Sequence, residues 1–95
     1  MKTEFDYIHF VEKAHLGVTT VWHCFNGHHD LLGIVKWNPH WRQYCYFIEG
    51  SLTPNKDEFI VFSSGCLTDI VSFLTQVNEL HKLELIKRKK EANNE

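Results

Sequence analysis

The sequence predicts an α+β fold, an antiparallel β-meander of about four to five strands with one long C-terminal helix packed on one face. Two observations predict it. Short runs rich in β-branched and aromatic residues, separated by Gly, Asn and Pro turn signals, fill most of residues 5–62. The apolar period then changes from that of a strand to that of a helix. Because a meander leaves a sheet face that one amphipathic helix can cover, we expect a two-layer domain.

Five runs are predicted as strands, and each is followed by a turn or a change of pattern. Asn26-Gly27 is the strongest short-range hairpin signal. Pro39 removes a ladder donor and favours a turn, and Gly33 suggests a bulge inside its strand. We expect strands over residues 5–12, 18–25, 31–37, 41–48 and 59–62.

The helix is predicted over residues 66–88, with a serine of the Ser63-Ser64 pair as its N-cap. Its apolar stripe weakens beyond His81, so the first four turns are expected to be packed and the end exposed. The predicted stripe consists of Leu67, Ile70, Val71, Leu74 and Val77, widened by Phe73 and Leu80. Residues 1–88 are expected to form a single domain, and residues 89–95 a basic and polar frayed tail.

Length and composition restrict the class of protein. The 95 residues are enough for one domain, and 43% hydrophobic with 23% charged residues is an ordinary globular mixture, which argues against wholesale disorder. No apolar run approaches the roughly 18 residues of a membrane span, and the acids near Met1 argue against a secretory signal. The three cysteines, Cys24, Cys45 and Cys66, are an odd number without a C-x-x-C pair. We therefore expect free thiols and a cytoplasmic location.

Charge is distributed unevenly along the chain. Residues 1–80 hold five Lys/Arg against nine Asp/Glu (net −4), whereas residues 81–95 hold five against three (net +2). The basic run Lys87-Arg88-Lys89-Lys90 is a nucleic-acid patch or, as we favour, a set of cations that complements the end of a helix.

The most suggestive feature for function is the aromatic segment over residues 37–47. Aromatic faces stack on bases, and the guanidinium group of an Arg can bind a phosphate or carboxylate with two hydrogen bonds. On the strand, Cys45 and Phe47 point one way and Tyr44 and Tyr46 the other. If Cys45 and Phe47 meet the helix, then Arg42, Tyr44 and Tyr46 lie on the uncovered face. The predicted ligand-binding residues are Lys36, Trp37, Trp41, Arg42, Tyr44 and Tyr46.

Neither a metal site nor a catalytic site is favoured. His23, Cys24, His28, His29 and Asp30 surround one predicted turn and are residue types that bind zinc. However, adjacent strand residues point to opposite faces, so we interpret the segment as a polar turn. The chain has no phosphate loop, G-x-S-x-G elbow or H-E-x-x-H motif. We expect no catalytic residues, no metal and no cofactor.

Part of the chain resembles a known group of proteins. The strings Leu32-Gly33-Ile34-Val35-Lys36-Trp37, Trp41-Arg42-Gln43-Tyr44-Cys45-Tyr46-Phe47 and Cys66-Leu67, with Ile70, Phe73 and Leu74, carry the likeness. They resemble short uncharacterised proteins of phages, prophages and bacterial mobile elements that share an L-G-x-I-x-W…W-R-x-Y-x-F…C-L-x-x-I-x-x-F-L pattern. Ile48 stands where that pattern often has Pro. The resemblance implies a small accessory protein that acts on a host defence or a nucleic-acid process, and it assigns no site residues.

Two hypotheses for function follow, both non-enzymatic. In the first, the protein binds a nucleotide or a nucleic-acid strand on its aromatic and Arg-bearing sheet face. In the second, it is an inhibitor or adaptor that binds a host protein through the same surface, since Trp, Tyr and Arg are common interface anchors. An uncovered sheet face also favours a homodimer.

Overall fold

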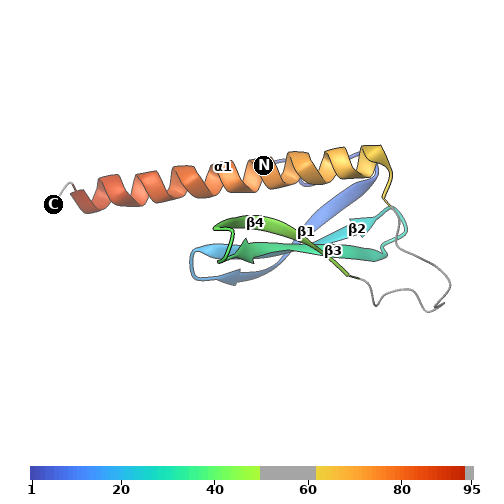
Figure 1. The fold of residues 1–95 in the computed structure, drawn as a ribbon, viewed down its shortest axis with the longest axis horizontal. Coiled ribbons are helices and arrows are strands. Elements are labelled where there is room, and N and C mark those ends of the chain that lie inside the picture. The colour runs from blue at the N-terminus through green and yellow to red at the C-terminus, as the bar shows by residue number, and fades with distance from the viewer. Residues whose placement is uncertain (50–61, 94–95) are drawn as a thin grey trace.

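The fold is a four-stranded sheet with one helix across it. The computed structural model describes residues 1–49 and 62–93. Four consecutive antiparallel strands form a single sheet in the order β1-β2-β3-β4, and α1 lies on one of its faces (Figure 1). The elements are β1 (Ile8–Leu16), β2 (Thr19–Asn26), β3 (Leu31–Asn38), β4 (Gln43–Ile48) and α1 (Ser64–Asn93). The predicted α+β meander with a C-terminal helix is confirmed.

Several element boundaries differ from the sequence-based expectation. β1 continues through residues 13–16, expected as a loop, because a bulge at Lys13 keeps the strand paired with β2. α1 begins at Ser64 and ends at Asn93 rather than at residue 88. Ser63 caps it as expected, since its Oγ accepts the Cys66 N–H at 3.2 Å. Of the predicted strand over residues 59–62, only Phe62 is among the described residues.

The core lies between α1 and the covered face of the sheet. Phe73 of α1 is fully buried, its ring stacked on Phe10 of β1 at a centroid distance of 3.8 Å and lying edge-on to Trp22 of β2 at 5.4 Å. The stripe predicted for the helix is only partly right. The buried helix residues are Ile70, Phe73 and Val77, whereas Leu67, Val71 and Leu80 are exposed.

Tyr44 and Tyr46 of β4 point toward α1. The register pairs Tyr44 with Trp37 and Tyr46 with Val35, which is fully buried on the covered face. The Tyr46 ring lies over Gly33, where a Cβ would come within 2.4 Å of the ring, so the missing side chain makes room for the tyrosine. Of the two arrangements that strand alternation leaves open, the structure has the one in which Tyr44 belongs to the core and Tyr46 packs against it.

The two edges of the sheet are covered differently. At the β1 edge the N-terminal segment folds back, and the Thr3 carbonyl accepts the Phe10 N–H at 2.9 Å. At the β4 edge, the side-chain amide of Asn78 accepts the Tyr44 N–H at 2.7 Å and donates to the Tyr44 carbonyl at 3.3 Å. The N–H and C=O groups of Tyr44 thus point away from β3. Because these groups alternate in direction along an antiparallel strand, those of Tyr46 and Ile48 point away from β3 as well.

The molecule is elongated. Its extents are 59 × 23 × 21 Å, because the helix extends well beyond the sheet at its C-terminal end (Figure 1). Every side chain from residue 82 to 90 is exposed. No helix among residues 1–49 and 62–93 is both long and apolar enough to cross a membrane.

Candidate functional site: the groove between β4 and α1

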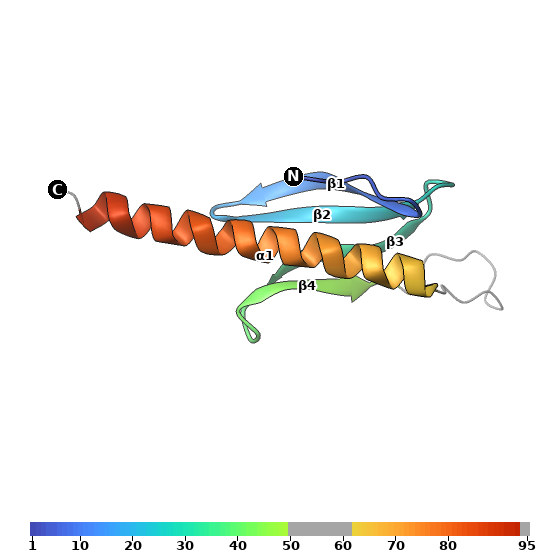
Figure 2. The same cartoon turned by 90° about the horizontal axis from the view of Figure 1, so that it is seen from above.

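A groove runs between the outer edge of β4 and α1. Seen from above, α1 crosses the sheet with β4 along one side of it (Figure 2). The larger part of the groove has a volume of about 570 Å³, within the range of ligand-binding clefts. It is lined by Trp41, Gln43, Tyr44, Cys45, Tyr46, Val71, Leu74, Thr75, Asn78, Glu79 and Lys82.

The turn between β3 and β4 presents an exposed tryptophan at one end of this groove. Asn38 Oδ1 accepts the backbone N–H groups of His40 and Trp41, at 2.9 and 3.2 Å, which fixes the turn. Arg42 has φ of 53°, a left-handed conformation that is uncommon for residues other than glycine. The Trp41 side chain stands in solvent and is 71% exposed. An exposed tryptophan beside a strained residue is typical of a binding surface.

A smaller hollow of about 220 Å³ continues the groove around Trp41. It shares Trp41, Gln43, Asn78 and Lys82 with the larger one, and we call the two together the edge groove. The remaining residues of the smaller hollow are Trp37, Arg42 and His81. The centres of the Trp37 and His81 rings lie 4.4 Å apart, so these two rings form the floor where the turn meets the helix. Arg42 and Lys82 make this end cationic, while Glu79 lines the larger hollow.

The structure brings five of the six predicted ligand-binding residues to the edge groove. Trp41 and Arg42 are exposed there, Trp37 and Tyr46 are half-buried, and Tyr44 is buried. The sequence does not single out the helix residues that complete the groove, chiefly Val71, Leu74, Asn78, His81 and Lys82. Val71 and Leu74 belong to the predicted stripe, and the packing of Phe73 into the core leaves Val71 61% exposed beside β4.

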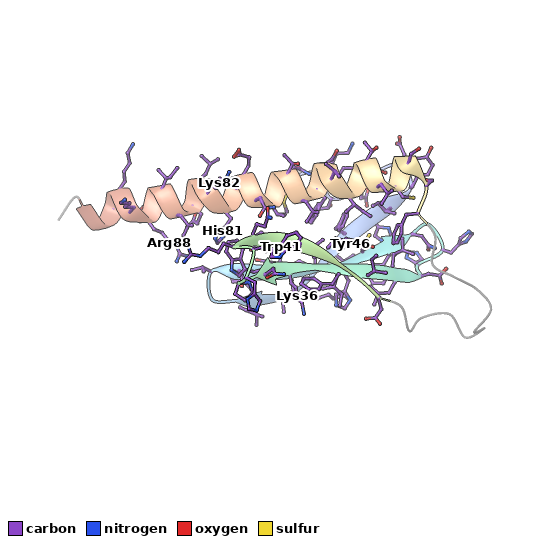
Figure 3. The ribbon with its side chains drawn as sticks, viewed as in Figure 1. Lys36, Trp41, Tyr46, His81, Lys82 and Arg88 are labelled. Atoms are coloured by element: carbon purple, nitrogen blue, oxygen red, sulfur yellow. The ribbon has the colours of Figure 1, made fainter. Side chains whose placement is uncertain are left out.

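The sixth predicted residue, Lys36, lies on the opposite side of the sheet (Figure 3). Its Nζ stands 4.6 Å from the centre of the Phe47 ring. We call this side the open face, because no element of the described ranges covers it. His9 stacks on Phe25 there at 5.6 Å. By the strand register the open face includes His9, Val11, His23, Phe25, Ile34, Lys36, Cys45 and Phe47.

Two buried titratable groups lie near the inner wall of the groove. Burial raises the pKa of the Cys24 thiol to about 11, and it also raises the pKa of the Tyr46 hydroxyl, with the neighbouring Cys24 as a further cause. Both shifts favour the neutral, unreactive form. Within the described residues, the buried Tyr46 hydroxyl has no hydrogen-bond partner of good geometry.

The residues considered for a metal site do not converge. His23 lies on the open face, whereas its neighbour Cys24 is fully buried on the covered face. The Asp30 carboxylate accepts a hydrogen bond from the Asn26 side chain at 3.1 Å. In the part of the chain that the structure describes, no three His, Cys, Asp or Glu side chains are grouped as metal ligands.

Comparisons with known proteins add no relative. No protein-family model matches the chain, and neither the curated proteins nor the solved structures give a match.

Proposed function

We propose that this chain is a non-enzymatic binding protein that holds a partner protein in its edge groove. The single observation that carries the proposal is the exposed Trp41, which stands at the end of a groove with apolar walls. Trp and Arg are among the residues most enriched at the energetic centres of protein interfaces, and Trp41 and Arg42 are adjacent at this turn. The second support is the β4 edge itself, which no strand of residues 1–49 or 62–93 covers on its outer side, because an open edge strand is a template for pairing with another chain.

The remaining features support a binding role in a reducing compartment. The two resolved pKa shifts, of Cys24 and Tyr46, move these groups away from reactivity at neutral pH. All three cysteines are free thiols, which supports a cytoplasmic location. The resemblance to short phage and mobile-element proteins supports a host protein as the partner, and hence the role of an inhibitor or adaptor.

The experiment is an affinity capture from a bacterial lysate with matched groove variants. Val71→Asp places a charge on the apolar wall of the groove, and Leu83→Asp places the same charge at a comparably exposed helix position that does not line it (61% and 60% exposed). We expect one host protein to be retained by the wild type and by Leu83→Asp, and to be lost with Val71→Asp and Trp41→Ala. Retention of the same protein by all four chains would refute the groove as its binding site.

A nucleotide is the second candidate ligand, and one observation favours it. The exposed Trp41 ring and the cations Arg42 and Lys82 line the same hollow, which is a suitable set for stacking on a base and binding its phosphates. A bound nucleotide raises the melting temperature by mass action. We therefore expect, if this candidate is right, that added nucleoside triphosphates stabilise the wild type and do not stabilise Arg42→Ala.

A further inference from the structure

The β4 edge offers backbone groups that the rest of the described chain does not use. In the β3–β4 ladder, Tyr44, Tyr46 and Ile48 direct their N–H and C=O groups away from β3, as the bonds from Tyr44 to Asn78 show. Asn78 occupies the position beside Tyr44 only. Pairing along this edge is therefore closed at Tyr44 and, among the described residues, open at Tyr46 and Ile48.

The groove beside that open stretch is apolar. Val71 and Leu74 of α1 line it on one side and Tyr46 lines it on the other. Ile48, which is 67% exposed, lies further along the same strand. A groove between an edge strand and a helix fits an extended peptide, because the strand supplies main-chain hydrogen bonds and the helix side supplies a pocket for alternate side chains.

The end of the groove at Trp41 is suited to a negatively charged group. Arg42 and Lys82 line the smaller hollow, together with the amide side chains of Gln43 and Asn78, and this hollow has no carboxylate in its lining. Glu79 lines only the larger hollow. A carboxylate that enters at the Trp41 end thus meets two cations and two amides, which can form charge-assisted hydrogen bonds to it.

The direction of the bound chain follows from these two ends. β4 runs from Gln43, at the cationic end, to Ile48. A peptide whose last residue lies at the cationic end therefore runs antiparallel to β4. Asn78 already bonds to the backbone of Tyr44, next to the cationic end. A bound peptide that continued past this end would therefore have no free edge of β4 to pair with. Both features favour a peptide that ends there.

We infer that the edge groove binds the C-terminus of a partner protein as an added strand, antiparallel to β4. The peptide pairs with the backbone of Tyr46, places an apolar side chain against Val71 and Leu74, and directs its terminal carboxylate to Arg42 and Lys82. This inference rests on the proposed function, and it specifies which part of the partner enters the groove.

The experiment uses short random peptides in two forms, one with a free C-terminal carboxylate and one with an amidated C-terminus. Binding to the whole chain is measured by the change in Trp fluorescence and by the backbone amide signal of Tyr46. We expect the peptides that bind to carry an apolar residue near the C-terminus. Amidation of that C-terminus is expected to lower their affinity about 10-fold or more. Lys82→Gln is expected to cause a similar loss, whereas Arg88→Gln, a cation on the same helix that pairs with Glu84 outside the groove, is not.

The other outcomes separate this inference from the function on which it rests. If peptides bind and respond to Val71→Asp but not to amidation or Lys82→Gln, the C-terminal assignment is wrong and the proposed function stands. If no peptide binds, this inference is wrong, and the lysate capture with the groove variants still decides the proposed function. If peptides bind but neither Val71→Asp nor Trp41→Ala weakens them, the edge groove is not their site and both are wrong. If sedimentation shows a dimer that Val71→Asp converts to a monomer, the groove holds a second copy of this chain and the inference is overturned.

Discussion

The two edges of the sheet show how one small fold treats the same problem in opposite ways. The chain itself closes the first part of the β1 edge, since the Phe10 N–H donates to Thr3 and the Ile8 carbonyl accepts from Phe5. Gln76 of α1 holds this segment, because its amide binds the backbone of Lys2 with both atoms, at 2.9 and 3.1 Å. The β4 edge is held by a similar amide contact from Asn78 at one residue, and an apolar groove with an exposed tryptophan lies beside it. We conclude that packing dominates the β1 side, and we assign binding to the β4 side.

The largest expected effect tests the packing of the β1 side. Phe73→Ala removes a fully buried ring that stacks on Phe10 and contacts Trp22. We expect the free energy of unfolding to fall by about 3–5 kcal/mol, measured by urea denaturation. Val71→Ala, on the exposed wall of the groove, is the control and is expected to change it by less than about 1 kcal/mol. Similar losses in both variants would contradict the division between the two sides.

The next effect concerns the buried thiol next to the groove wall. The pKa of Cys24 is raised from 9.0 to about 11, so the unfolded chain loses its thiol proton at a lower pH than the folded chain. Below pH 9 the free energy of unfolding therefore does not depend on this group. As the pH rises from 9 to 11, the free energy of unfolding falls by about 2–3 kcal/mol. Denaturation curves across this range should show a weaker pH dependence in Cys24→Ala. An identical dependence in the two proteins would rule out this role of Cys24.

Gly33 tests how β4 is fitted to the sheet. A Cβ at this position would lie 2.4 Å from the Tyr46 ring and 2.7 Å from the Phe47 carbonyl oxygen. We expect Gly33→Ala to destabilise by about 1–3 kcal/mol, because the ring and the strand must both shift. Gly27→Ala is the matched control, since a Cβ there would meet no atom within 4 Å and its φ is not positive. Thermal melts of the two variants give the comparison directly.

The smallest expected effect concerns the two side-chain amides of α1 that bind backbone groups at the edges of the sheet. Asn78→Ala leaves the partly buried backbone groups of Tyr44 without a protein partner, so we expect a loss of about 1–2 kcal/mol. Gln76→Ala removes an exposed contact that water can replace, and its effect is expected to stay within about 0.5 kcal/mol. A larger loss in Gln76→Ala would show that the β1 edge, rather than the β4 edge, depends on the helix amide.

Much of the fold follows from local sequence patterns. Asn26-Gly27, Pro39 and the serine cap locate turns and the helix entry within a few residues, because these residues act on the backbone beside them. The apolar pattern underestimates the extent of α1, since the last turns of the helix carry few apolar residues and periodicity gives no signal there.

The sequence predicts the site only in part. The segment from Trp37 to Tyr46 supplies groove residues, but the sequence leaves open which of its two faces meets the helix. Alternation shows that Tyr44 and Cys45 point in opposite directions, and it does not show which of them meets the helix. That choice depends on the fit of Tyr46 over Gly33, a contact between two strands. The helix side of the groove escapes prediction for the same reason, because the rotation of α1 is set by the packing of Phe73 between Phe10 and Trp22.

The most direct test of the edge groove as a docking site is the hydrogen exchange of two neighbouring edge amides, measured by NMR on the free protein at low concentration. The Tyr44 N–H is bonded to Asn78 and is expected to be protected. The Tyr46 N–H, on the same edge and two residues further along, is expected to exchange much faster and to become protected when a groove ligand is added. Equal protection of both amides in the free protein would show that the β4 edge is already paired, and would contradict the assignment of the edge groove as a docking site.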